Sequence, residues 1–166
     1  MDEEALQRLV LVVDDQSEHL QIIEQVLCEK ASSAQLNTQI NTQINTQIET
    51  QSNPQVMTIT TTTEATDFIL GQGIYADAQR PDIVLLNMHL ADGQAQTLLT
   101  TIKANPQLKQ IPTIVLTLDA SQEEVFNSYR QQCNSFVVKP QDLNHLSATL
   151  HVIKSFWLGL VTLPAK

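Results

Sequence analysis

The chain has 166 residues, enough for one domain with a substantial hydrophobic core. Its formal net charge of -9 provides no basic surface for a nucleic-acid backbone, so we predict that it does not bind nucleic acid directly. No apolar run approaches the length of a membrane span, and the acidic start Met1-Asp2-Glu3-Glu4 is unlike a secretory signal. We therefore expect a cytoplasmic protein with no membrane association.

Four short apolar segments are predicted to be buried strands, and each is followed by polar residues. In chain order they are Leu9–Val13 before Asp14 and Asp15, Ile83–Leu86 before Asn87, Ile111–Leu116 before Thr117, and Phe136–Val138 before Lys139 and Pro140. Continuous apolar runs of this length are typical of strands covered on both faces of a parallel sheet. The carboxyl ends of such strands share one crevice, so we expect the polar residues to meet there.

A fifth strand is expected at Val56–Thr60, and a helix is expected after each strand. Ser17 is a candidate N-cap for the first helix, and the second is expected over Glu64–Leu70. The third contains Leu98, Leu99 and Ile102, the fourth begins at a capping box formed by Ser121 and Glu124, and the last covers about Asp142 to Trp157. This alternation predicts an α/β fold, with a five-stranded parallel sheet and helices on both faces.

Residues 31–55 are predicted to be a low-complexity insertion between the first helix and the second strand. The tetrapeptide Asn-Thr-Gln-Ile occurs three times over residues 37–48. Its apolar residues lie four apart, a spacing that fits one face of a helix and one face of a strand equally well. Two interpretations stay open. A solvated insertion is favoured by the poor helix propensity of Asn and Thr, and an extension of the first helix is the alternative.

The strand-end residues resemble those of the receiver domains of two-component response regulators. The resemblance rests on the acidic pair Asp14-Asp15, on Thr117 and on Lys139-Pro140, with Thr117 and Lys139 following Asn87 by 30 and 52 residues. It implies one receiver-like domain over residues 1–166, with a flavodoxin-like fold and the strand order 2-1-3-4-5. The apolar tail, residues 156–166, is similar to that of the small stand-alone regulators that partner cyanobacterial phytochrome kinases.

Asn87 stands where the receiver family has the aspartate that accepts a phosphoryl group. An amide is not a carboxylate nucleophile, so phosphoaspartate cannot form there. The family's usual proline and glycine in the following loop are replaced by Ala91 and Ala95. These departures favour an atypical pseudo-receiver that acts by protein contact and is not an enzyme. The alternative is a normal phosphoacceptor response regulator, of a phytochrome kinase for example, whose acceptor aspartate was substituted to Asn87.

The resemblance also implies a magnesium site made by Asp14, Asp15 and the backbone carbonyl of His89. Magnesium prefers hard anionic ligands, and one carboxylate is missing here. We therefore expect weak magnesium binding or none, and no other cofactor.

The remaining pocket residues are given structural roles. Lys139 is expected to pair with the acidic residues, and Thr117 to hydrogen-bond Asn87. Phe136 occupies the aromatic switch position of the family, but an ordinary core residue fits it equally well.

The last helix carries two apolar stripes. Leu143, Leu146, Leu150, Ile153 and Trp157 recur at the spacing of a core face. A second stripe, about 120° away, consists of Ala148, Val152 and Phe156. An exposed apolar strip indicates a protein contact. We predict a homodimer interface at Ala148, Val152, Phe156 and Trp157, extended by the apolar tail residues, and a sensor histidine kinase or another signalling protein as partner.

Two further classes of site are disfavoured. Cys28 and Cys133 lie in different regions without metal-ligand spacing, and we expect both to be reduced. A flavin or nucleotide site would call for a glycine-rich loop after the first strand, and residues 14–17 contain no glycine.

Overall fold

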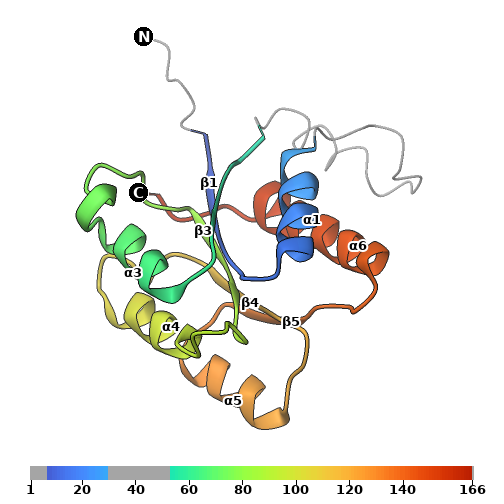
Figure 1. Cartoon of the computed structure of the whole chain (residues 1–166). Coiled ribbons are helices and arrows are strands. Elements are labelled where there is room, and N and C mark those ends of the chain that lie inside the picture. Colours follow the sequence, from blue (N-terminus) through green and yellow to red (C-terminus); the bar gives the residue numbers. More distant parts are fainter. Residues whose placement is uncertain (1–6, 30–52, 166) are drawn as a thin grey trace.

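The computed structural model describes residues 7–29 and 53–165 (Figure 1). The predicted insertion, apart from its last three residues, lies outside the described residues, as does residue 166 of the tail. The side chain of Asn53, in the described end of the predicted insertion, links the two described segments by donating a hydrogen bond to the carbonyl oxygen of Cys28 at 2.8 Å.

Five parallel strands form one sheet in the order β2-β1-β3-β4-β5, which confirms the predicted fold. The strands are β1 (Leu9–Val13), β2 (Gln55–Ile59), β3 (Ile83–Asn87), β4 (Thr113–Thr117) and β5 (Ser135–Val138). Every residue of β1, β3 and β4 is buried, which explains their continuous apolar runs. The register pairs Val13 with both Ile59 and Leu86, so the carboxyl ends of the central strands lie level with one another.

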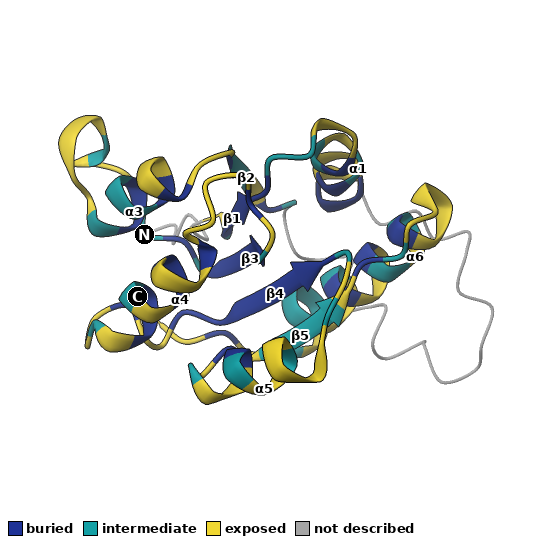
Figure 2. Cartoon of the chain, turned by 60° about the horizontal axis from the view of Figure 1, so that its bottom comes forward, coloured by how far each residue is buried: buried dark blue, intermediate teal, exposed yellow. Residues whose placement is uncertain are grey.

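Helices cover both faces of the sheet, and alternate strand residues serve the two layers (Figures 1 and 2). The helices are α1 (Ser17–Cys28), α3 (Thr62–Leu70), α4 (Ala95–Ala104), α5 (Gln122–Arg130) and α6 (Leu143–Lys154), with a 3-10 turn η1 (Gly73–Tyr75). Leu11 and Val13 face the layer of α3 and α4, whereas Val10 and Val12 face the layer of α1 and α6. This period of two is the geometry of a strand buried on both sides.

Side-chain caps mark the starts of α3 and α5. The hydroxyl of Thr61 accepts a hydrogen bond from the backbone of Glu64, so α3 begins two residues before the predicted start. Ser121 and Glu124 form a complete capping box at α5. The prediction for Ser17 was wrong, because Gln16 is the N-cap of α1 and makes no side-chain capping bond.

The end of the chain differs from the predicted apolar surface. After α6 the backbone widens into a π-helical turn, η2 (Ser155–Leu160), and the following segment then packs against the layer of α1 and α6. Leu163 is only 6% exposed, and Leu158 and Val161 are partly buried in the same layer. Part of the tail therefore packs on the core, because Leu163, Leu158 and Val161 cover side chains that would otherwise face water, whereas Phe156 and Leu160 stay exposed. Leu143, predicted to be in the core, is exposed.

Candidate functional site

Asp14 is the centre of the crevice at the carboxyl ends of the strands. It is 2% exposed, and both of its carboxylate oxygens accept hydrogen bonds. Oδ1 accepts from the backbone of Gln16 at 3.0 Å and from Nδ2 of Asn87 at 3.2 Å. Oδ2 accepts from Nζ of Lys139 at 2.7 Å. The predicted pairing of Lys139 with an acidic residue is confirmed.

The Asn87 side chain is buried, and both ends of its amide form hydrogen bonds. Its NH2 group donates to Asp14, and its Oδ1 accepts from the backbone of His89 at 3.2 Å. The amide thus joins β1 to the loop that follows β3. An ionised aspartate has no proton to donate, and at this position it would face a second carboxylate at the same distance. The pattern of donors and acceptors around position 87 suits an amide.

Lys139 contacts a histidine that the sequence reasoning did not place in the site. Nζ of Lys139 lies 3.1 Å from Nδ1 of His19, and the lysine is 1% exposed. An ammonium group only donates, so Nδ1 of His19 accepts the bond and its proton is on Nε2. Burial, followed by the charge of Lys139, lowers the pKa of His19. The lysine charge is therefore balanced by Asp14, while His19 adds a neutral acceptor from α1.

Two carboxylates hold the loop after β3. Asp15 Oδ2 accepts from the backbone of Ala91 at 2.8 Å, and Asp92 Oδ2 accepts from the backbone and hydroxyl of Thr62 at 2.8 and 2.7 Å. Burial alone would raise the pKa of Asp92, but these bonds, with one from the backbone of Gln94, bring it below its usual value. The loop is therefore attached both to the end of β1 and to the first turn of α3.

Thr117 bonds to His89 rather than to Asn87, contrary to our expectation. Its Oγ1 lies 2.9 Å from Nδ1 of His89 and 3.0 Å from the carbonyl oxygen of Asp119. Nε2 of His89 lies 2.8 Å from Oε1 of Glu124. Hydrogen bonds from Ser121 and then from His89 lower the pKa of Glu124. His89 thus connects the end of β4 to the first turn of α5.

Proton counting shows what this connection requires. An ionised Glu124 and the carbonyl of Asp119 only accept, and the Thr117 hydroxyl has a single proton. All three contacts are satisfied at once when both ring nitrogens of His89 carry a proton. The sequence signal for this role was the position of His89, two residues after Asn87 at a strand end, together with Glu124 in the first turn of the neighbouring helix.

A small cavity lies beside this connection. It measures about 150 Å³, and its lining includes Met88, Thr117 and Phe136. Phe136 is partly buried against the layer of α3 and α4, as an ordinary core residue would be. Sites for drug-sized ligands are typically about 300–1,000 Å³, so this cavity is small for a nucleotide or a flavin.

A divalent cation in the crevice would compete with nitrogen donors of the protein. Both oxygens of Asp14 and one oxygen of Asp15 already accept hydrogen bonds from such donors. Within the described residues, no group of three or more His, Cys, Asp or Glu side chains is arranged to hold a metal ion. A hard cation needs several oxygen ligands and would have to share these oxygens with the donors that already bind them.

The predicted contact residues divide into two groups. Ala148, Val152 and Phe156 are exposed, with Val152 at 68% and Phe156 at 46%. Trp157 is partly buried in the layer of α1 and α6 and meets the Phe156 ring edge-on, with 5.4 Å between ring centroids. Leu160 adds a further exposed side chain at 59%. We call Val152, Phe156 and Leu160 the α6 patch.

The family model of the response regulator receiver domain matches residues 35–151. The chain belongs to this family. Receiver domains are signalling modules that interact with histidine kinases and other signalling proteins. The matched stretch begins after β1 and α1, so the acidic pair of the receiver lies outside it.

Two cyanobacterial relatives resemble this receiver over most of its length. It is 39% identical over 101 residues to response regulator Rcp1 of Synechocystis sp., a match that covers 61% of this chain and 69% of Rcp1. The Mn(2+)-bound form of Rcp1 superposes with a TM-score of 0.79 at 29% identity, covering 95% of this chain and 99% of Rcp1. The phosphorylated cyanobacterial phytochrome response regulator RcpA has the same TM-score at 27% identity, covering 96% and 99%.

A third relative is more distant. The probable methanogenesis regulatory protein FilR2 of Methanothrix harundinacea is 34% identical over 79 residues, or 48% of this chain and 51% of FilR2.

In the part of the receiver that the structure describes, none of the helices is both long enough and apolar enough to cross a membrane.

Proposed function

We propose that this receiver transmits signals by protein contact and is not phosphorylated on aspartate. The hydrogen bonding of Asn87 carries the proposal. Its amide is buried at the phosphoacceptor position and bonds to Asp14 on one side and to the backbone of His89 on the other. An amide nitrogen engaged in this way is not a nucleophile, and no carboxylate replaces it at the end of β3.

The hydrogen bonds of the other crevice residues support a receiver that signals without a phosphoryl group. Lys139, which would bind a phosphoryl oxygen in an active receiver, is paired with Asp14, and Thr117 is engaged by His89. Rcp1 has been solved in a Mn(2+)-bound form. In this chain we propose that Asp14, Asp15 and the carbonyl of His89 bind magnesium weakly or not at all, because the carboxylate oxygens already have donors from the protein.

A test of the chemistry uses acetyl phosphate with magnesium and intact-mass measurement. We expect the mass of the wild-type chain to stay unchanged. A phosphoryl adduct mapped to Asp14, Asp15 or Asp92 would overturn the proposal.

The Asn87→Asp variant, treated in the same way, separates the proposal from the alternative of a normal phosphoacceptor. An otherwise intact receiver should become phosphorylated once the carboxylate is restored. We expect little phosphorylation of this variant, because Thr117 remains bonded to His89 and Ala91 and Ala95 remain in the loop.

For the contact surface, we propose that the α6 patch forms a symmetric homodimer in the cytoplasm. A sensor histidine kinase, of the phytochrome class by analogy with RcpA, is the proposed signalling partner. The patch places three exposed apolar side chains along one helix and its π-helical extension. Such a strip is favourable to bury at roughly 25 cal/mol per Å².

A further inference from the structure

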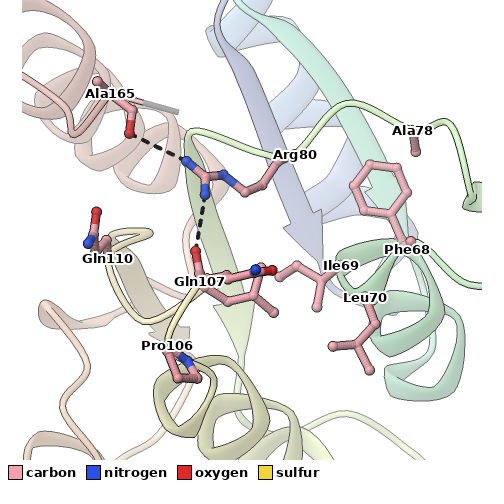
Figure 3. A pocket seen from close by; sticks show the side chains of 11 residues that line it. Phe68, Ile69, Leu70, Ala78, Arg80, Pro106, Gln107, Gln110 and Ala165 are labelled. Atoms are coloured by element: carbon pink, nitrogen blue, oxygen red, sulfur yellow. Dashed lines mark hydrogen bonds between the residues drawn. The ribbon is translucent and has the colours of Figure 1, made fainter.

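A second cavity, larger than the one beside His89, lies at the end of the sheet opposite to Asn87. It measures about 600 Å³, within the range of small-molecule sites, whereas the crevice cavity is about a quarter of that volume. It is formed where α3 ends, where the chain enters β3, where α4 connects to β4, and by the segment after η2 (Figure 3). All of these lie at the amino-terminal ends of the strands, so the cavity is separate from the receiver crevice.

Arg80 supplies the charge of this pocket. Its Nη1 donates to the carbonyl of Gln107 at 3.1 Å and its Nη2 to the carbonyl of Ala165 at 3.4 Å (Figure 3). Its Nε is buried and has no hydrogen-bond partner within the described structure. Carbonyl groups satisfy donors but leave the positive charge uncompensated, and a buried donor without a partner is costly.

Among the described residues, Arg80 has no ion-pair partner, although the protein is acidic. The chain has a net charge of -9, yet Arg80 is the one charged residue among those that line the pocket. Across the described ranges 7–29 and 53–165, no ion pair involves it. A guanidinium presents a planar fork of donors that matches an acidic group.

The opposite wall of the pocket is apolar. Figure 3 shows Phe68, Ile69 and Leu70 on the side away from the guanidinium, and Pro106 and Leu108 also line the pocket. Phe68, Ile69 and Leu108 belong to the hydrophobic layer between the sheet and α3 and α4, so the wall is supported by the core. The pocket therefore combines one fixed cation with a rigid apolar surface.

We propose that this pocket binds a small carboxylate that carries an apolar chain. The carboxylate would accept hydrogen bonds from the Arg80 fork, and the chain would lie against Phe68, Leu70 and Leu108. A single cation suits a monoanion, whereas a phosphate dianion would call for a second cation. The site lies apart from Asn87 and its function does not depend on whether the receiver is phosphorylated.

Octanoate is the probe. Its binding is measured by two-dimensional NMR of the full chain labelled with nitrogen-15. We expect saturable shifts of the backbone signals of Gly71, Gln107 and Gln110, with octanoate kept below its aggregation concentration. Acetate lacks the apolar chain and octanol lacks the charge, so each should bind at least about tenfold more weakly. The fork is removed in Arg80→Gln, and the matched control Arg130→Gln makes the same change at an exposed position of α5.

The proposal is supported if octanoate binding is lost or falls about tenfold in Arg80→Gln and is retained in Arg130→Gln. A second variant, Ala78→Phe, adds bulk at an exposed lining position without touching the guanidinium, and it should also reduce binding. Equal binding of octanoate and octanol, binding that survives Arg80→Gln, or shifts confined to the α6 patch would overturn it. The same spectra report whether each variant is folded.

Discussion

At position 87, an amide differs from a carboxylate by one hydrogen-bond donor gained and one negative charge lost. The donor reaches Asp14, whose other oxygen is held by Lys139. Two neighbouring carboxylates would repel each other unless a cation lay between them. The amide removes this repulsion, so the crevice of this receiver is balanced by its own side chains.

The comparison of an amide with a carboxylate at position 87 also predicts how the Asn87→Asp variant binds magnesium. Asn87→Asp adds a third carboxylate and removes the donor that occupies Asp14, so we expect the magnesium affinity to rise at least about tenfold, or about 1.4 kcal/mol. Isothermal titration calorimetry measures it. Asn87→Ala is the matched control, since it removes the same donor without adding charge and should bind no better than wild type. A wild-type chain that binds magnesium as tightly as Asn87→Asp would contradict this account.

The burial of Lys103 leads us to predict that the free energy of unfolding depends on pH. It is buried, and its ammonium donates to the carbonyls of Lys109 and Ile111 and to Oδ1 of Asn134. Burial lowers its pKa to about 8, against roughly 10.4 in an unfolded chain. Between these values the unfolded chain binds more protons than the folded chain, so the contribution of Lys103 to the free energy of unfolding increases as pH rises.

Urea unfolding at pH 7, 8.5 and 10 measures this contribution. Lys103→Met serves as the reference, because it lacks the titrating group and shares the other groups of the chain. We expect wild type to gain stability relative to Lys103→Met as pH rises. The burial of Cys133 raises the pKa of the neighbouring thiol, so the comparison is repeated in a Cys133→Ala background. A wild-type advantage that falls across this range would show that Lys103 stays fully charged in the folded chain.

At the scale of elements, the first turn of α5 joins secondary structure to the crevice. Ser121 caps the helix, Glu124 completes the capping box, and the other carboxylate oxygen of Glu124 reaches His89. The helix start and the His89 contact therefore depend on the same side chain. A change at the cap should affect both the stability of α5 and the position of His89.

Ser121→Ala tests the cap. Losing the side-chain bond at an N-cap costs about 1 kcal/mol, so we expect a decrease of that size in the free energy of unfolding from urea titration. Ser17→Ala is the control, because Ser17 is an exposed first residue of α1 and not its cap. It should change stability by less than about 0.5 kcal/mol. Equal losses in the two variants would mean that the box seen at α5 contributes nothing specific.

At the scale of the whole molecule, the return of the tail onto the core determines which apolar side chains remain outside. Leu163 is buried and Trp157 is half-buried, which leaves the α6 patch as the exposed remainder. The proposed dimer therefore depends on fewer residues than the apolar tail suggested. Because phosphorylation cannot occur at Asn87, we expect its assembly to be constitutive.

Val152→Asp tests the proposed dimer. Charge at the centre of a buried apolar contact is costly, so we expect this variant to be a folded monomer by light scattering, with its circular dichroism unchanged. Ile74→Asp is the matched control, since it adds the same charge at a 90% exposed apolar residue of η1 and should leave the dimer intact. If wild type stays monomeric at high micromolar concentration, the α6 patch is instead a site for a different partner.

Sequence alone determined the order of the elements, the parallel sheet and the position of the crevice. Every residue of β1 is apolar, β3 is apolar up to Asn87, and caps such as Ser121 act within one helical turn, so these signals are local. The polar residues at the strand ends were found for the same reason. The family resemblance then indicated the absence of an acceptor aspartate at position 87.

Only the tertiary structure decided which of these polar residues become partners. Lys139 meets Asp14 across 125 residues of sequence and also contacts His19, and Thr117 bonds to His89 instead of Asn87. Periodicity shows which side of an element is buried, but it does not show which donor reaches which acceptor once the elements are packed. The position of the tail was also decided by packing. Burying an apolar segment is equally favourable against its own core and against a partner, so the sequence does not show which of the two surfaces it covers.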